Sequence, residues 1–296
     1  MSPRTLPALA LGLLSAGAAH AQVAEACLDY AGPPPAGYDE QVQQDFLANH
    51  AALATTFSPL HAPVPHEPGH GAIGVDLAVM PPLGCERRFV LNHTKTEETN
   101  MAPVVPRPRV SFAFPALGPF VPYASVAYVP PVKVFGTTNV IFSGELGVGV
   151  PVGESLQLGG RFHATSHRTI GEIATPFIEG DPAIDDMLVA SSLGVDVMAG
   201  WRIGPVVPYA AIGLTDVSTV FYVGDDGVVT NNLHPYLGPV FSVGVDALLV
   251  ERLRLAGELY GAPGGYALPD PDVPSVTPAS RYGHIYTARL RVAVEL

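Results

Sequence analysis

The chain of 296 residues has little charge: only 14% of its residues are Asp, Glu, Lys or Arg, against roughly 25% in a typical soluble domain. It is 48% hydrophobic, with a mean hydropathy of +0.28. Too few charged side chains remain to cover the surface of an ordinary soluble protein of this size. This composition excludes a disordered chain and counts against a soluble secreted β-protein.

Positive charge is scarcer than negative charge. The chain has 15 Lys and Arg against 27 Asp and Glu, a net charge of -12, and its only lysines are Lys95 and Lys133. Because a phosphate backbone needs a basic surface, we expect no nucleic-acid partner.

Long apolar runs, cysteines and cofactor motifs are also sparse. No segment after the first 21 residues offers 18 uninterrupted apolar residues, so no helix is expected to span a membrane. The chain has 2 cysteines, Cys27 and Cys85, for which a disulfide and two unpaired thiols both stay open. The sequence contains no P-loop, G-x-S-x-G or paired C-x-x-C motif, and we expect no cofactor.

The first 21 residues have the three parts of a secretory signal peptide. Arg4 supplies the positive start, residues 6–18 the apolar stretch, and Ala19-His20-Ala21 the cleavage site. The apolar stretch is too short for a membrane anchor. These residues predict export, with Gln22 as the first residue of the mature chain, into a compartment that permits disulfides.

Residues 22–70 differ from the rest of the chain. A Pro-rich stretch at 32–35 precedes an expected helix over 38–54, which Asp39 can cap. The prolines of 57–70 forbid both a helix and a central strand. We expect a periplasmic or plug-like segment, with the helix over 42–53 contacting Arg161 or Arg289 inside a barrel. A disordered periplasmic tail is the alternative.

From Gly71 onward, apolar and polar residues alternate with period two, as in strands with one apolar and one polar face. In the last segment, for example, Leu290 and Val292 alternate with Arg289 and Arg291. Ten such runs are predicted, over about 71–80, 106–115, 120–129, 137–150, 154–166, 187–202, 205–222, 233–249, 251–261 and 281–296.

The connections between these runs alternate in length. Those at 116–119, 151–153, 203–204 and 250–251 are short, and those at 81–105, 130–136, 167–186, 223–232 and 262–280 are longer. Alternation alone fits a soluble β-sandwich equally well. The export signal, the uneven turns, the even count and strands longer than the usual 5–6 residues together favour a transmembrane barrel. We therefore predict an all-β fold: a ten-stranded antiparallel outer-membrane β-barrel over residues 71–296, behind a short helical and irregular segment.

Two sequence patterns resemble bacterial outer-membrane barrels. The final strand, YTARLRVAVEL at 286–296, resembles the C-terminal β-signal, although Leu296 stands where that family usually ends in Phe. The Pro-Tyr strands GPFVPYASVAYV (118–129), GPVVPYAAIGLT (204–215) and LHPYLGPVFSVGV (233–245) are similar to those of OmpA- and OmpW-like small barrels. The resemblance implies a Gram-negative outer membrane, outer-membrane lipid as surroundings and the barrel-assembly machinery as a partner. It transfers no active site.

The alternation also predicts which side chains face the lumen. Apolar residues such as Val195, Leu255, Leu290 and Val292 should face lipid. The predicted luminal polar residues are Asp76, Arg109, Glu145, Arg161, His163, Asp196, Arg202, Asp246, Arg254, Glu258, Arg289, Arg291 and Glu295. The predicted small luminal residues, which leave space, include Gly74, Ala78, Ser111, Ala113, Gly147, Gly149, Gly159, Ser192, Gly194, Gly200, Gly213 and Gly244.

Two luminal roles stay open: charges that pair and fill the interior, or a selective polar pore. The leading hypothesis is a non-enzymatic barrel, either a small pore for transport or a structural barrel. An outer-membrane lipid-modifying enzyme is an alternative, but it needs a nucleophile beside its base. His163 and Ser166 fall on opposite faces, so no catalytic residue is predicted.

No metal site is predicted either. The spacing of His61, His66, Glu67 and His70 matches no zinc pattern. The acidic loop residues are interpreted as solvated charge that can bind divalent cations weakly; they are Glu172, Glu179, Asp181, Asp185, Asp186, Asp225, Asp226, Asp270 and Asp272.

Overall fold

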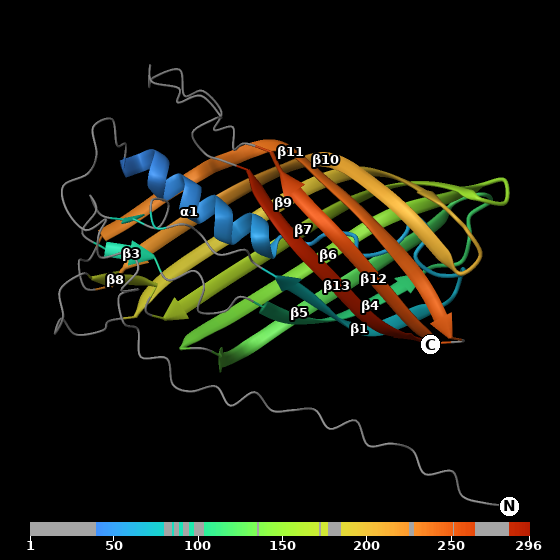
Figure 1. The fold of residues 1–296 in the computed structure, drawn as a ribbon, viewed down its shortest axis with the longest axis horizontal. Coiled ribbons are helices and arrows are strands. Elements are labelled where there is room, and N and C mark those ends of the chain that lie inside the picture. Colours follow the sequence, from blue (N-terminus) through green and yellow to red (C-terminus); the bar gives the residue numbers. More distant parts are fainter. Residues whose placement is uncertain are drawn as a thin grey trace, which may run out of the picture.

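Ten long strands close into an antiparallel barrel in the computed structural model of the protein (Figure 1). The structure describes residues 40–79, 85, 89–90, 95–97, 104–134, 136–171, 173–176, 185–224, 228–250, 252–263 and 284–296. The expected signal peptide, residues 22–39, Cys27 and most of the acidic loop residues lie outside the described residues.

The barrel strands follow one another around the wall in chain order. They are β1 (Gly71–Val79), β4 (Val104–Ala113), β5 (Val121–Val134), β6 (Thr137–Val152), β7 (Leu156–Gly171), β9 (Asp186–Trp201), β10 (Val206–Val223), β11 (Val228–Val250), β12 (Leu253–Ala262) and β13 (Ile285–Glu295). The wall closes where β1 pairs antiparallel with β13, with Val75 opposite Val292. All ten predicted strands are confirmed, and so is the predicted all-β barrel.

Three short strands form a separate small sheet that the sequence pattern did not predict. They are β2 (Phe89–Val90), β3 (Lys95–Glu97) and β8 (Ala174–Pro176). With two or three residues each, they are too short to show an alternation. Figure 1 shows β3 and β8 at the end of the barrel opposite the C-terminus.

The two ends of the barrel differ in their connections. At the short-turn end, the strands are joined by residues 114–120, 153–155, 202–205 and 251–252, and both Gly71 and Leu296 lie there. Gly118, Gly153 and Gly204 adopt positive φ values of 63°, 65° and 59° in these turns, a conformation that favours glycine.

The long-loop end carries the connections 80–103, 172–185 and 263–284. Two predicted longer connections are shorter than expected, because β5 runs on to Val134 and β11 begins at Val228. Only residues 135–136 and 224–227 are left between the strands there. The alternation of apolar and polar residues breaks off in the sequence at these strand ends, at Pro130-Pro131 in β5 and at Val228-Val229 in β11.

The outer face of the barrel is apolar and the inner face is polar. Leu146 and Val197 on the outer face are 63% and 64% exposed, whereas Glu145 and Asp196 beside them in the sequence are 3% and 7% exposed. Leu290, Val292 and Val195 are exposed on the outer face and Leu255 is half-buried. This distribution is the reverse of that in a soluble protein and suits an outer face in contact with hydrocarbon.

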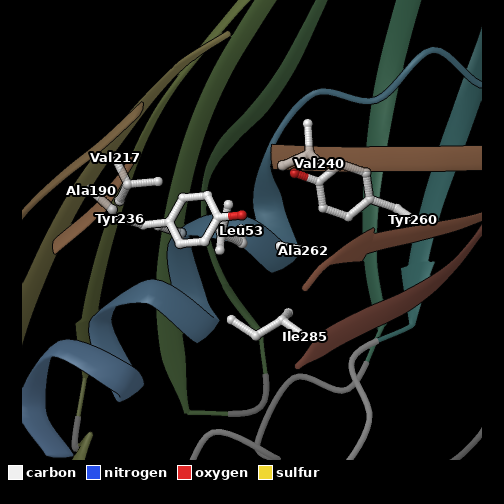
Figure 2. Close-up of a cluster of buried hydrophobic side chains, with 9 residues drawn as sticks. Leu53, Ala190, Val217, Tyr236, Val240, Tyr260, Ala262 and Ile285 are labelled. Carbon is white, nitrogen blue, oxygen red and sulfur yellow. The ribbon is translucent and has the colours of Figure 1, made fainter. Parts of the chain in front are cut away.

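Helix α1 (Glu40–Thr55) enters this polar interior from the long-loop end (Figure 1). The helix was expected over 38–54. Its last turns pack on an apolar patch of the inner wall, where Leu53 contacts side chains of β9 to β13 (Figure 2). That cluster contains Ala52, Leu53, Ala190, Val217, Tyr236, Val240, Tyr260, Ala262 and Ile285. In the described part of the chain, no helix is long and apolar enough to cross a membrane.

Candidate functional site in the barrel lumen

The lumen is occupied by the chain's own residues 40–66, here called the luminal segment. Its first part is α1, and its second part, residues 56–66, is here called the extended stretch. The prolines of the stretch, Pro59, Pro63 and Pro65, rule out a continuing helix. Its backbone therefore needs hydrogen-bond partners from elsewhere, since a buried unpaired N–H or C=O group is costly.

The extended stretch runs along β7 through the barrel. Thr55 Oγ1 lies 3.4 Å from His167 Nδ1, the Phe57 N–H donates to Thr165 Oγ1 over 3.1 Å, and the Val64 N–H donates to the Gln157 side-chain oxygen over 3.2 Å. As the residue number in the segment increases from 55 to 64, the residue number of its partner in β7 decreases from 167 to 157, so the two run antiparallel. Since β7 starts at the short-turn end, the luminal segment runs from the long-loop end to the short-turn end.

Arginines of the wall bind the carbonyl groups of the segment. Four consecutive carbonyls, from residue 55 to residue 58, each accept a hydrogen bond from a different arginine. The pairs are Arg107 with Thr55 at 2.9 Å, Arg289 with Thr56 at 2.7 Å, Arg161 with Phe57 at 2.9 Å and Arg109 with Ser58 at 3.2 Å. We call these four side chains the arginine cradle.

The cradle makes further contacts with the same segment. Arg289 also donates to the carbonyls of Leu53 and Ala54, at 3.0 and 3.3 Å. The Arg109 guanidinium stacks over the Phe57 ring at 4.2 Å from its centroid. The cradle therefore binds the end of the helix and the start of the extended stretch with both polar and cation–π contacts.

Carboxylates of the wall bind the N–H groups of the stretch. The Leu60 N–H donates to Glu258 Oε2 over 3.2 Å, and the Ala62 N–H donates to Asp246 Oδ2 over 2.9 Å. Glu258 also accepts a hydrogen bond from the hydroxyl of Tyr209 at 2.8 Å. The positively charged arginines of the wall thus bind backbone carbonyl groups, and the negatively charged carboxylates bind backbone N–H groups.

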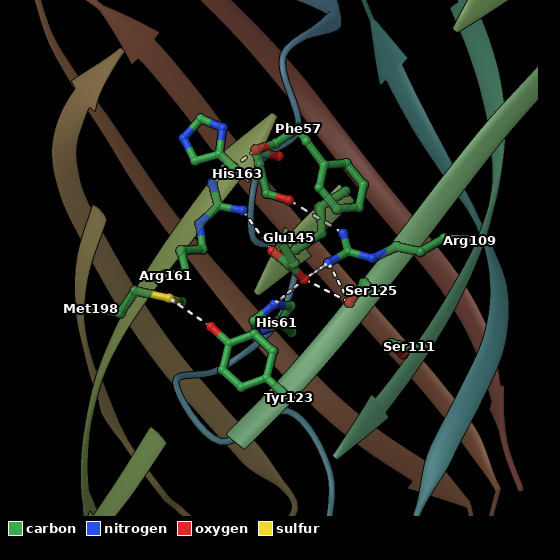
Figure 3. A network of polar contacts seen from close by, with 12 residues as sticks. Phe57, His61, Arg109, Ser111, Tyr123, Ser125, Glu145, Arg161, His163 and Met198 are labelled. Atoms are coloured by element: carbon green, nitrogen blue, oxygen red, sulfur yellow. Dashed lines mark hydrogen bonds and ion pairs between the residues drawn. The ribbon is translucent and has the colours of Figure 1, made fainter. Parts of the chain in front are cut away.

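Glu145 joins the cradle to the segment (Figure 3). It accepts from Arg161 Nη1 at 2.7 Å and from Ser125 Oγ at 2.7 Å, contacts Arg109, and lies 3.0 Å from His61 Nε2. A carboxylate at 3% exposure persists only with several such partners. His61 therefore ties the extended stretch to the central ion-pair network.

Further ion pairs complete the network. Asp196 pairs with Arg161 at 2.7 Å, and Asp76 with Arg109 at 3.2 Å. Towards the short-turn end, Arg254 lies 3.4 Å from Asp246, and His66 lies 3.0 Å from Glu295. Removing one member of such a buried pair leaves an uncompensated charge.

Glycines of the wall make room for Pro63 of the stretch. A Cβ atom at Gly149 would lie 2.3 Å from the Pro63 carbonyl oxygen, and one at Gly200 would lie 2.8 Å from Pro63 Cδ. At Gly159 the nearest Pro63 atom would be 3.2 Å away. The absence of side chains at these three positions is what allows the proline to lie against the wall.

The structure places most of the predicted luminal residues inside the barrel. Asp76, Arg109, Glu145, Arg161, His163, Asp196, Asp246, Glu258, Arg289 and Arg291 are buried there, while Arg254 and Glu295 are partly exposed at the short-turn end.

Arg202 is an exception to this placement. Its side chain is exposed and its backbone N–H donates to the Ser155 carbonyl over 2.8 Å. Strand β9 ends at Trp201, so the alternation that assigned Arg202 to the lumen no longer applies at the turn.

Some buried polar residues of the wall were not among the predicted ones. Arg107 lies two positions before Arg109 within the same predicted strand, so the alternation could have found it. Tyr209 and Gln157 also face inward, and the alternation could have found them too, because Gln157 shares its face with Gly159 and Tyr209 shares its face with Gly213. Asp186, expected in an acidic loop, is buried at the start of β9 and accepts the N–H groups of Ile173 and Gly224, each at 2.9 Å.

The residues considered for catalysis and metal binding lie apart. His163 is buried in the lumen, whereas Ser166 is exposed on the outer face. The outward hollow around Ser166 also contains Ser191, Ser218 and Asp216, and within the described wall no histidine lines it. His61 and His66 bind different carboxylates, and among the described residues no group of three or more His, Cys, Asp or Glu could hold a metal.

Two histidines of the luminal segment are shifted by burial. Burial lowers the pKa of His50, in α1, to about 4, and neither of its ring nitrogens has a hydrogen-bond partner in the described part of the chain. Burial also lowers the pKa of His66, although its hydrogen bond to Glu295 acts in the opposite direction. Cys85 is disulfide-bonded, and because Cys27 is not described, the predicted Cys27–Cys85 bridge stays a prediction.

No family model matches the chain, and no curated protein matches it. Several solved structures are similar in outline. The translocator domain of the autotransporter NalP from Neisseria meningitidis has a TM-score of 0.43 and 10% identity, over 77% of this chain and 89% of that chain. The Pseudomonas putida toluene transporter TodX has a TM-score of 0.38 and 12% identity, over 84% and 75%.

A third similar structure is Ail, the attachment invasion locus protein of Yersinia pestis, with a TM-score of 0.34 and 10% identity over 77% of this chain and 99% of that one. At such identities and scores the likeness assigns no role to this chain. The barrel fold rests on the strand ladders described above, and the narrower resemblance to OmpA- and OmpW-like barrels stays a prediction.

Proposed function

We propose that the protein is a non-enzymatic outer-membrane barrel that its own luminal segment keeps closed at rest. The observation that carries this proposal is the arginine cradle: four consecutive carbonyls of the segment each bind a different arginine of the wall. An open polar pore would leave these guanidinium groups to water and to passing solutes. Here they hold a polypeptide backbone.

Placement in a membrane is supported by the outer face, whose exposed large apolar side chains include Ile73, Phe142, Leu193 and Leu290. The connections are short at one mouth and long at the other, and the first and last residues of the barrel, Gly71 and Leu296, both lie at the short-turn mouth. This arrangement fits a barrel whose short turns face the periplasm. We expect the protein to fractionate with the outer membrane and to change its gel mobility on boiling. Recovery as a soluble periplasmic protein would contradict the proposal.

The facing of single residues gives a second test. Val195→Arg would place a charge on the lipid side, and near the midplane it should cost about 2–4 kcal/mol of barrel stability. Asp196→Ala, one residue away on the luminal side, should leave membrane insertion intact while it removes the ion pair with Arg161. The reverse result would mean that the apolar face points inward.

A gated pore is the second candidate function. If the segment left the lumen, the wall would still carry six arginines and five carboxylates, which is one positive charge in excess. These are Arg107, Arg109, Arg161, Arg254, Arg289 and Arg291, with Asp76, Glu145, Asp196, Asp246 and Glu258. That polar lining favours conduction of small ions once the segment is displaced.

Planar-bilayer conductance separates the closed barrel from the gated pore. Thr56 Oγ1 donates to Ser192 Oγ over 3.1 Å, so the double variant T56C/S192C should form a disulfide that locks the segment to the wall. The matched control is S166C/S191C, because these two residues face each other on the outer face of neighbouring strands and do not touch the segment.

We expect the native barrel to stay closed, and a variant without residues 22–66 to conduct. Suppose that the native barrel shows channel openings. If oxidation abolishes these openings in the T56C/S192C variant but not in the S166C/S191C variant, the protein is a gated pore. Steady conductance of the native barrel that the lock leaves unchanged would show that the segment does not occlude the lumen, and would overturn the proposal.

A further inference from the structure

The luminal segment has a direction, and this direction has a consequence for the residues before it. Contacts along β7 order the segment from Thr55 beside His167 to Val64 beside Gln157. The register continues to the mouth of the barrel, where His66 contacts Ser111 and Glu295. The chain then passes directly into β1 at Gly71, at the short-turn end.

The other end of the segment lies at the opposite mouth. α1 contacts β2, which belongs to the connection 80–103 of the long-loop end. In Figure 1 the start of α1 lies at the same end of the barrel as β3 and β8, away from the C-terminus. The segment therefore crosses the barrel from one mouth to the other instead of entering and returning on the same side.

We infer that the residues before Glu40 leave the barrel through the long-loop mouth, so that the N-terminal region of the exported chain is presented on the outside of the cell. This inference rests on the proposed outer-membrane location, in which the short turns face the periplasm. The barrel is then an anchor for a surface-exposed N-terminal region, and the arginine cradle is the point of attachment inside the wall.

The contacts of the cradle suit an anchor. Residues 53–58 bind the wall through carbonyl groups, which every sequence offers, and through the Phe57 ring. The prolines that follow hold the chain extended, so the rest of the stretch spans the remaining depth of the lumen in few residues.

Cysteine labelling in intact cells tests the inference. Glu40→Cys reports on the start of α1, Lys133→Cys on the exposed outer rim of β5, and Glu154→Cys on the exposed β6–β7 turn at the short-turn end. The probe is a maleimide too large and too polar to cross the outer membrane. The unmodified chain, which keeps Cys27 and Cys85, gives the background labelling. A protease site inserted after Ala36, cut by protease added to intact cells, gives an independent readout.

We expect Glu40→Cys and Lys133→Cys to be labelled in intact cells, and Glu154→Cys to be labelled only after the outer membrane is permeabilised. Labelling of Lys133→Cys from outside, with Glu40→Cys and the inserted site protected until permeabilisation, would overturn the inference and leave the closed barrel intact. Labelling of Glu154→Cys instead of Lys133→Cys would show the opposite orientation and would overturn the inference as well. Absence of the protein from the outer-membrane fraction would overturn the proposed function itself.

Discussion

The two halves of the luminal segment bind the wall in different ways. α1 satisfies most of its own backbone hydrogen bonds and contacts the wall mainly through apolar side chains such as Leu53, while the cradle binds only the carbonyls of its last three residues. The extended stretch has no internal hydrogen-bond ladder, and its backbone binds side chains of the wall instead. The same barrel thus holds the helical half mainly by burial of apolar surface and the extended half mainly by ionic hydrogen bonds, and the cradle binds both halves where they meet.

This difference explains how the luminal charges are arranged. Where the helix passes, the wall carries Ala190, Val217 and Tyr236. Where the extended stretch passes, it carries the cradle and two carboxylates. The charged side chains are therefore not spread evenly over the lumen. They lie where the extended backbone needs hydrogen-bond partners. The contrast predicts that changes beside the stretch act through backbone contacts and changes beside the helix act through packing.

Gly149→Ala should have the largest effect. Its Cβ would meet the Pro63 carbonyl at 2.3 Å, and because that atom belongs to the backbone, the cost should exceed the about 1–3 kcal/mol usual for overpacking. The stretch should leave the wall, which would be measured as loss of the T56C/S192C cross-link and a gain of conductance. Gly257→Ala, which would meet nothing within 4 Å, is the control; equal behaviour of the two variants would contradict the described contact.

Arg289→Ala should come next. It removes hydrogen bonds to the carbonyls of Leu53, Ala54 and Thr56, and with charged donors of this kind we expect about 3 kcal/mol of lost segment binding. The cross-link yield again reports the change. Arg168→Ala on the exposed outer face should have no effect, and Arg289→Lys should restore part of the binding. An Arg289→Ala barrel that stays closed and fully cross-linked would show that the cradle does not hold the segment.

Leu53→Ala probes the helical half. It removes a fully buried side chain from the apolar cluster, and because α1 can shift in the lumen, a cost of about 2 kcal/mol is expected. The start of α1 should become more accessible to protease while the cross-link at residue 56 persists. Loss of both together would show that the two halves bind as one unit.

The smallest effect should be a pH dependence centred on His50. Its pKa of about 4 in the docked segment lies below the ordinary value of about 6.5, so the undocked segment binds more protons between these two values. Docking is fully stable above pH 6.5 and weakens as the pH falls, by about 1 kcal/mol at pH 5.5. Conductance and cross-link yield at pH 7.5 and 5.5 measure the change. His50→Leu should remove the part of the difference between pH 7.5 and pH 5.5 that comes from protonation of His50. An unchanged difference in this variant would show that His50 does not cause the pH dependence.

The sequence alone predicts the barrel well because strand alternation is a local signal. All ten strands follow from it, and so does the inward placement of Glu145, Arg161 and Asp196 between outward apolar neighbours. Arg202 is exposed in the turn after β9, where the strand has ended, and lines the hollow at the short-turn mouth together with His66, Arg254 and Glu295. The short strands β2, β3 and β8 give no pattern long enough to detect.

The occupied lumen was harder to predict. A plug-like segment followed from the missing alternation and from the small luminal residues, but its path did not. Arg289 contacts the last residues of α1, and Arg161 contacts Phe57 after the helix rather than the helix itself. A backbone that is bound by side chains distant in the sequence has no periodic pattern of its own. The prolines show only that this stretch is neither a helix nor a central strand.

The seam between β1 and β13 sets an order on assembly. The luminal segment directly precedes β1, and Arg289 of the cradle lies on β13, so both edges of the seam border the enclosed chain. A segment arriving after closure would have to pass, free end first, through a channel whose charges had already paired with one another. Laying the segment along β7 and β9 before the last strand pairs avoids that passage. We therefore expect closure of the barrel and capture of the segment to occur in a single folding step, with the segment's contacts contributing to the barrier to unfolding as well as to stability.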